Sequence, residues 1–205
     1  MNAAVLLLFA CSEFALNNPP PVPPAEPPDP DPDADFGEPP DWSTCSAGWF
    51  GQYYNLPADH PDLEPDAAPV TTTDLDWWDD THLATRRFDG SLDLGANWWP
   101  VDEGIEGDPD YFAARWTAWL RVTTAGAMPV VLGAETVAWL SVNNVEVARV
   151  ADDELGATSV DVQVSSGQFP IELRFGQLRA GASGLRFRIA DGDDVQLCYP
   201  DFSGE

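Results

Sequence analysis

The side chains that could do chemistry are few, and their spacing does not favour catalysis. The sequence contains two histidines, His60 and His82, and their separation matches no zinc-binding motif. Neither a Gly-x-Ser-x-Gly nucleophile motif nor a glycine-rich phosphate-binding loop is present. Acidic residues are abundant, but only their separation in space would identify a glycosidase pair. We therefore expect a protein that is not an enzyme, with no metal ligand set and no cofactor.

Clusters of acidic residues could still supply the oxygen ligands that calcium prefers. They lie at positions 74–80, 152–154 and 191–194. None of them has the twelve-residue calcium-loop spacing that ends in glutamate. We interpret all three as solvated loop carboxylates, and the last as a turn between two strands. Calcium binding at one of them stays an open alternative.

Two pairs of adjacent tryptophans are the candidates for ligand contacts. Trp77 and Trp78 form the first pair, and Trp98 and Trp99 form the second, both in a loop-rich part of the chain. Adjacent residues on a strand point to opposite faces, so one ring of each pair could be buried while its neighbour is exposed. An exposed ring could stack on a sugar or on an apolar protein surface. The preferred alternative is that both rings of each pair fill a long crossover loop against the core.

The charge balance excludes one class of partner. The chain carries 35 acidic residues against nine basic ones, all of them arginine, which gives a formal net charge of −26. Nucleic-acid binding needs clustered cations to neutralise phosphates, so a nucleic-acid partner is not expected. The hydrophobic content of 44% and the nine tryptophans are nevertheless sufficient for a folded core.

Residues 1–10 have the character of a lipoprotein-type signal segment. The apolar run ends in Leu8-Phe9-Ala10-Cys11, the Leu-x-small-Cys arrangement after which a bacterial lipoprotein is cleaved and acylated. We expect lipidation at Cys11, which would hold the exported protein on a membrane. Ser12, rather than aspartate, follows this cysteine and favours the outer membrane or cell surface. Plain secretory cleavage, giving a secreted or periplasmic protein, is the alternative.

The other two cysteines, Cys45 and Cys198, bracket the part of the sequence that looks folded. Export to an oxidising compartment would allow them to form a disulfide, and we predict this pairing. The alternative is a pair of unrelated buried thiols.

Residues 11–44 are expected to form a disordered acidic stalk. The segment 17–41 contains eleven of the twenty prolines, no cation and almost no apolar side chain that could be buried. Such a composition favours extended polyproline II structure and cannot form a core. A ligand for proline-recognition domains is the competing interpretation.

Residues 45–205 are expected to form one antiparallel β-barrel or sandwich, an all-β fold. Short segments with alternating or apolar patterns are separated by turn signals, and few stretches have a helical period. Asn143-Asn144 has the left-handed tolerance that a two-residue hairpin turn requires. The predicted strands are 48–55, 85–92, 112–123, 128–133, 137–142, 145–150, 158–164, 170–175, 185–189 and 195–199.

Four segments, in order, resemble the protective-antigen fourteen-kilodalton (PA14) domain family. Residues 48–55, GWFGQYYN, resemble the first strand of that family, and residues 111–120, YFAARWTAWL, resemble its central Phe-x-x-Arg-Trp-x-Gly-x-Leu strand, with Ala118 at the glycine position. Residues 137–144, VAWLSVNN, resemble the following hairpin, and residues 169–188 resemble the closing pair of strands. The resemblance covers residues 48 to about 200 and implies a β-barrel module.

The resemblance implies a surface-displayed, non-enzymatic binding module, with carbohydrate or another envelope polymer as ligand. Calcium-dependent lectins of the family use two adjacent aspartates after the first strand of the central hairpin. The corresponding residues here include Ala134 and Glu135, and alanine offers no side-chain oxygen, so this calcium site is expected to be missing. A domain for protein–protein interaction or a structural spacer is the alternative, with an unknown protein partner; a glycosidase-type enzyme is a further one.

Overall fold

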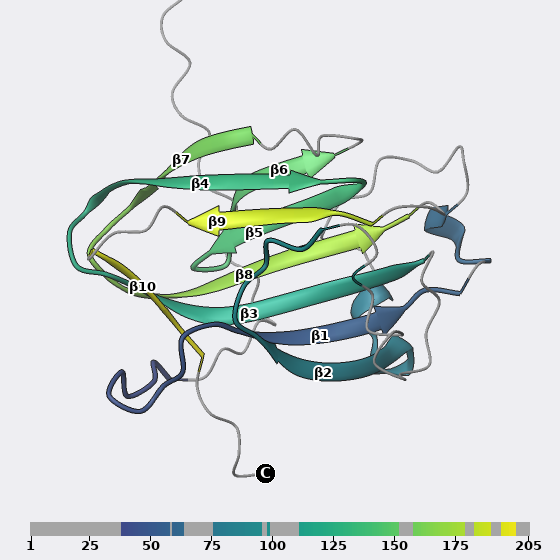
Figure 1. The fold of residues 1–205 in the computed structure, drawn as a ribbon, viewed down its shortest axis with the longest axis horizontal. Coiled ribbons are helices and arrows are strands. Elements are labelled where there is room, and N and C mark those ends of the chain that lie inside the picture. Colours follow the sequence, from purple (N-terminus) through teal and green to yellow (C-terminus); the bar gives the residue numbers. More distant parts are fainter. Residues whose placement is uncertain are drawn as a thin grey trace, which may run out of the picture.

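Two antiparallel sheets account for most of the chain that the computed structural model describes (Figure 1). The described residues are 38–57, 59–63, 76–95, 98, 111–151, 158–178, 183–189 and 194–199. The predicted signal segment, Cys11 and most of the predicted stalk lie outside these residues. No helix in the described part is long and apolar enough to cross a membrane. The predicted all-β fold is confirmed.

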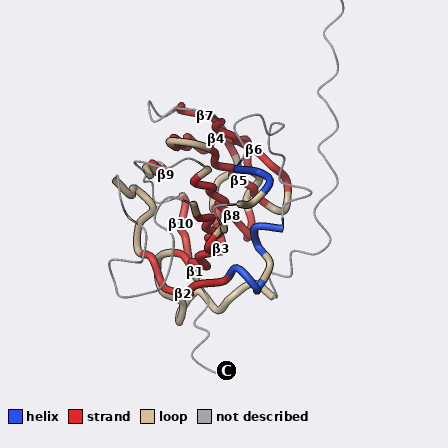
Figure 2. The backbone as a smooth tube through the Cα atoms, turned by 90° about the vertical axis from the view of Figure 1, so that its right-hand side faces the viewer, coloured by secondary structure: helices blue, strands red, loops and turns tan. Residues whose placement is uncertain are grey.

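The larger sheet has the strand order β2-β1-β3-β8-β5-β6, and β10 pairs with β3 as well. The smaller sheet has the order β7-β4-β9. Figure 2 views the two layers from the end, with β7 and β4 of the smaller sheet near β6 of the larger one. The strands of the larger sheet are β1 (Trp49–Asn55), β2 (Leu83–Asp89), β3 (Phe112–Val122), β5 (Val137–Val142), β6 (Val145–Ala151), β8 (Gly167–Gln177) and β10 (Val195–Cys198). Those of the smaller sheet are β4 (Gly126–Ala134), β7 (Thr158–Val164) and β9 (Leu185–Ile189).

Strand β3 organises the larger sheet. It pairs with β8 along its whole length, from Phe112 opposite Gln177 to Val122 opposite Gly167. Its other edge is shared, because β1 pairs with its first half and β10 with its second half. This sharing places the end of the folded chain beside the first strand.

The main core lies between the two sheets. Inward-facing residues of β1, such as Trp49 and Tyr53, alternate with outward-facing ones, such as Phe50 and Gln52. This period of two is what a strand with one buried face requires. The hairpin between β5 and β6 turns at Asn143-Asn144, with φ values of 53° and 62°, which confirms the predicted two-residue turn.

A second, smaller core covers the outer face of the larger sheet. The crossover between β1 and β2 contains three 3₁₀ turns, η1 (Pro61–Leu63), η2 (Asp76–Trp78) and η3 (Asp80–His82). Trp77 from η2 packs directly over Gly176 of β8, where a Cβ would lie 2.9 Å from Cη2 of the indole ring. The absence of a side chain at Gly176 therefore leaves the space that the Trp77 ring occupies. The cluster consists of Tyr54, Leu56, Trp77, Ala113, Val137 and Trp139.

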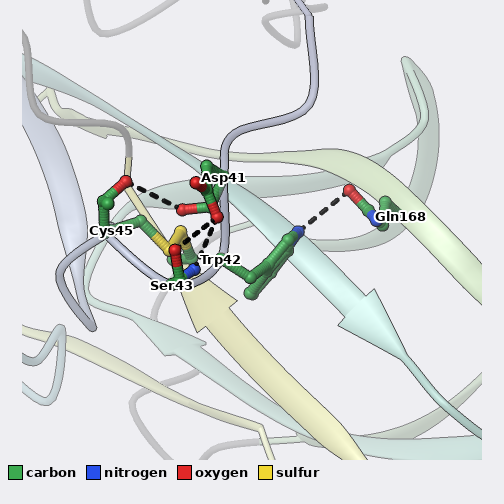
Figure 3. Close-up of a disulfide and its surroundings, with 7 residues drawn as sticks. Asp41, Trp42, Ser43, Cys45 and Gln168 are labelled. Atoms are coloured by element: carbon green, nitrogen blue, oxygen red, sulfur yellow. Dashed lines mark hydrogen bonds between the residues drawn. A yellow bond between two sulfur atoms is a disulfide. The ribbon is translucent and has the colours of Figure 1, made fainter.

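The two ends of the folded chain are joined covalently. Cys45 and Cys198 form a disulfide with a Cα–Cα distance of 5.7 Å, which confirms the predicted pairing (Figure 3). Just before the disulfide, the indole Nε1 of Trp42 donates to Oε1 of Gln168 at 2.9 Å, and Arg121 lies over the same indole ring. Part of the segment expected to belong to the stalk thus lies against the sandwich.

Candidate functional site

The tryptophans proposed from the sequence lie largely in the two cores. Trp77 is 0% exposed, so its ring has no free face, and we correct its assignment from ligand-binding candidate to core residue. Trp98 is half-buried and packs against Phe112 and Phe175 with ring centroids 5.0 and 5.2 Å apart. Trp78 is half-buried beside Tyr54. Trp99 lies outside the described residues.

A polar network is buried beneath the edge of the larger sheet. The carboxylate of Asp89 accepts hydrogen bonds from the Tyr53 hydroxyl at 2.5 Å, from Nε1 of Trp116 at 3.0 Å and from Nε of Arg87 at 2.9 Å. Burial, followed by the negative charge of Asp89, raises the pKa of the Tyr53 hydroxyl above its ordinary value. Tyr53 is fully buried and Asp89 is buried, so the centre of this network has no contact with solvent. Its role is to fasten the edge strand β2 to β1 and β3.

Three aromatic rings gather on the outer face of the same strands. Phe50 of β1 lies opposite Phe88 of β2 in the sheet register. Tyr199, just after β10, stacks on Phe50 with ring centroids 6.1 Å apart and an interplanar angle of 6°, and lies 5.1 Å from the Phe88 ring. Phe88 is 46% exposed, and among the described residues it is the large hydrophobic residue that is exposed rather than buried or half-buried. We call Phe50, Phe88 and Tyr199 the aromatic platform.

Local structure fixes the position of each platform ring. Gly48 precedes β1 with a φ of 139°, and a Cβ there would lie 2.5 Å from Cζ of Phe88, so only glycine leaves room for that ring. Tyr199 is held by a backbone bridge to Ser46 and directly follows Cys198. The disulfide therefore places the third ring beside the other two.

A row of polar side chains runs next to the platform on the same face. Two residues after Phe50 in β1, Gln52 lies opposite Arg86 of β2 and Arg115 of β3. Nε of Arg115 donates to the carboxylate of Glu172 on β8, and Nε of Arg174 approaches Oε1 of the same group at 2.5 Å. The outer face thus combines exposed ring surface with hydrogen-bond donors and acceptors. Such a combination suits a ligand that has both apolar C–H faces and hydroxyl groups.

A shallow cavity of about 330 Å³ lies at the open edge between the sheets. Arg188 on its rim donates through Nε to Asp93 at 2.8 Å, whereas Trp49 and Phe187 on its floor are buried. Its size is at the lower end of small-molecule pockets. It offers little ring surface, so it is a weaker candidate than the platform.

The hairpin position that carries the aspartate pair in calcium-dependent PA14 lectins is built differently here. Ala134 is buried, and the backbone N–H of Glu135 donates to the carbonyl of Gly184 at 3.0 Å. Of the three acidic clusters considered from the sequence, residues 152–154 and 191–193 lie outside the described residues. Asp194 accepts hydrogen bonds from the hydroxyls of Thr123 and Thr124, which lower the pKa of its carboxyl group.

Sequence reasoning missed the aromatic platform. A signal was present, because Phe50 and Gln52 alternate with inward-facing residues in the first strand. However, the partner rings Phe88 and Tyr199 belong to other strands, and only the register of β1 with β2 and the disulfide bring them together.

Comparison with known proteins identifies neighbours by fold and not by sequence. No protein-family model matches the chain, and no curated protein matches it. The Epithelial Adhesin 9 A domain from Candida glabrata, in complex with Galb1-4GlcNAc, superposes with a TM-score of 0.53 and 12% identity, covering 87% of this chain and 99% of that one. The Epithelial Adhesin 6 A domain from the same organism, in complex with Galb1-3GlcNAc, has a TM-score of 0.53 and 10% identity, covering 80% and 92%.

An anti-sigma factor domain-containing protein from Clostridium clariflavum superposes with a TM-score of 0.51 and 14% identity. The match covers 78% of this chain but only 49% of that one. At these identities the likeness concerns the fold alone. Because the adhesin A domains have PA14-type folds, the PA14 resemblance noted in the sequence is supported at the level of architecture.

Proposed function

We propose that this module is a non-enzymatic carbohydrate-binding domain displayed at the cell surface, and that the aromatic platform contacts the sugar. The observation that carries the proposal is the partly exposed set Phe50, Phe88 and Tyr199 beside the polar row of Gln52, Arg86 and Arg115. The adhesin A domains of similar fold, solved with bound glycans, support the ligand class.

Surface display is supported by the disulfide and by the signal segment expected from the sequence. The Cys45–Cys198 bridge indicates folding in an oxidising compartment. Lipid attachment at Cys11 and a proline-rich stalk would then hold the module away from the membrane. Metabolic labelling with a fatty-acid analogue tests this part, and absence of label that depends on Cys11 would refute the anchor.

The size of the expected effect follows from the exposure of Phe88. A phenylalanine side chain presents about 200 Å² when fully exposed, so 46% leaves roughly 90 Å² available. A sugar that covers half of this area would gain about 1 kcal/mol, at about 25 cal/mol per Å². Phe88→Ala should therefore weaken glycan binding roughly sixfold.

The experiment is a glycan array on the full chain, run with calcium and with a chelator, followed by titration of the best glycan. Val131→Ala is the matched control, because Val131 is a half-exposed apolar residue on the smaller sheet. We expect weaker binding in Phe88→Ala, unchanged binding in Val131→Ala, and no dependence on calcium. Equal binding by both variants would refute the platform as the site. No glycan signal, with a single envelope protein recovered in a pull-down, would favour the protein-interaction alternative.

A further inference from the structure

The two histidines that match no motif lie together in the structure. His60, Asp76 and His82 offer one ligand atom each, and these atoms all lie within 4.8 Å of one another. We propose that they form a binding site for a zinc-type divalent transition-metal ion. The inference does not depend on carbohydrate binding.

The crossover between β1 and β2 brings the three residues to one point. His60 lies in the turn that follows β1 and is 5% exposed. Asp76 begins η2, and His82 ends η3 directly before β2. Nε2 of His60 already lies 3.0 Å from Oδ1 of Asp76. The two imidazole rings are 6.2 Å apart between centroids.

The donor set selects the kind of metal. Imidazole nitrogens favour zinc, copper, nickel and cobalt, and a carboxylate is also a common zinc ligand. Calcium requires six to eight oxygen ligands and magnesium prefers an octahedral oxygen set, so neither fits two imidazoles and one carboxylate. Three protein ligands leave a fourth tetrahedral position for water. Because the side chain of Asp76 is 70% exposed, an ion could enter from solvent on that side.

A second layer of contacts holds the buried histidine in place. Nε1 of Trp77 donates to Oδ2 of Asp62 at 2.6 Å, and the Trp77 ring is anchored in the outer core. The same Oδ2 lies 3.7 Å from Nδ1 of His60. Nδ1 of His60 itself accepts a hydrogen bond from the backbone N–H of Asp62 at 3.2 Å, which fixes the orientation of the imidazole ring.

Neighbouring acidic groups have other partners and are not needed as ligands. Asp79 accepts a hydrogen bond from the backbone N–H of Thr81 at 2.8 Å and caps η3. Asp80 pairs with Arg86 of β2 at 3.6 Å. Bound metal would therefore join η2 and η3 to the turn after β1 and tighten the crossover that carries Trp77.

The test is calorimetric titration of zinc into the full chain. The protein carries no polyhistidine tag, its free thiol is alkylated, and millimolar calcium and magnesium are present to saturate non-specific acidic sites. We expect one saturable zinc site per chain and a rise in Tm on zinc addition, since a ligand that binds only the folded state stabilises it. Cobalt should give the visible absorption of a tetrahedral site.

Asp76→Asn and His82→Gln are the diagnostic variants, because both side chains lie at the open side of the site. Each should lower zinc affinity at least tenfold and reduce the Tm shift at the same zinc concentration. Asp161→Asn is the matched control, since it makes the same change at an exposed position of β7 in the other sheet, and it should leave both readouts unchanged. Circular dichroism spectra check that every variant is folded. Absence of saturable binding, or equal affinity in all four proteins, would overturn the site.

Discussion

Removal of the Cys45–Cys198 disulfide should destabilise the module strongly, and the size of the effect can be worked out. The bridge joins residues 153 positions apart. In the chain-entropy model, a loop of this length removes about 17 cal/mol/K from the unfolded state, or about 5 kcal/mol at 25 °C. A folded unit of roughly 160 residues unfolds with an entropy of about 0.3 kcal/mol/K, so the expected loss in Tm is roughly 15 °C.

The assay is thermal unfolding followed by tryptophan fluorescence, with and without reductant. Cys11→Ser provides the background, because a third thiol could otherwise exchange with the bridge. The Cys45→Ser/Cys198→Ser variant should melt at the same temperature as the reduced protein, which separates the loss of the bond from any effect of the reductant. Intact-mass measurement after alkylation confirms the number of free thiols in each sample.

The reasoning also predicts a functional consequence. Tyr199 directly follows Cys198, so loss of the bridge should loosen the third ring of the platform and weaken any glycan binding at temperatures where the module stays folded. A Tm loss below about 3 °C, with both thiols shown to be free, would refute the argument. It would mean that the pairing of β10 with β3 holds the end of the chain without covalent help.

Two further changes test the packing. Gly176→Ala should destabilise the protein by about 1–3 kcal/mol in urea titration, because the new methyl group overlaps the Trp77 ring. Gly126→Ala is the control and should be nearly neutral, because a Cβ there meets nothing within 4 Å. Equal effects of the two changes would contradict the packing of Trp77 over Gly176. Burial and the charge of Asp89 raise the pKa of Tyr53, so the folded state holds this proton more tightly than the unfolded state. The free energy of unfolding should therefore fall as the pH rises above about 10. Tyr53→Phe should reduce that fall, and an unchanged pH profile in this variant would contradict the assignment.

The strands of this fold could be predicted because their signals are local. Alternation predicted β7 and β8 as strands, although in β8 the outer residue Glu172 is buried as well. Asn143-Asn144 can adopt positive φ without a large steric penalty. The disulfide was also predictable, because Cys45 and Cys198 bracket the apolar part of the sequence. The strands and the turn depend on residues that are close in sequence, whereas the disulfide followed from the positions of two cysteines at the two ends of the apolar part.

The role of the tryptophans could not be settled from the sequence, because it depends on distant partners. Trp77 packs over Gly176, which lies nearly a hundred residues later and leaves space for the ring on β8. The same holds for His60 and His82, whose spacing matches no motif but which the crossover places around Asp76. A site of this kind becomes visible only when the crossover is folded.

The charges around the platform indicate which sugars it would accept. Arg86 is paired with Asp80, and Arg115 shares Glu172 with Arg174, so the arginines beside the rings are compensated by carboxylates. The chain as a whole carries a net charge of −26 and would repel an acidic polymer. Neutral sugars, whose hydroxyls can both accept from guanidinium groups and donate to carboxylates, fit this surface better than sulfated or uronic-acid polymers. Binding to the platform should therefore change less than about threefold between 50 and 500 mM salt, whereas a steep loss of affinity with salt would show that charge, and not ring stacking, selects the ligand.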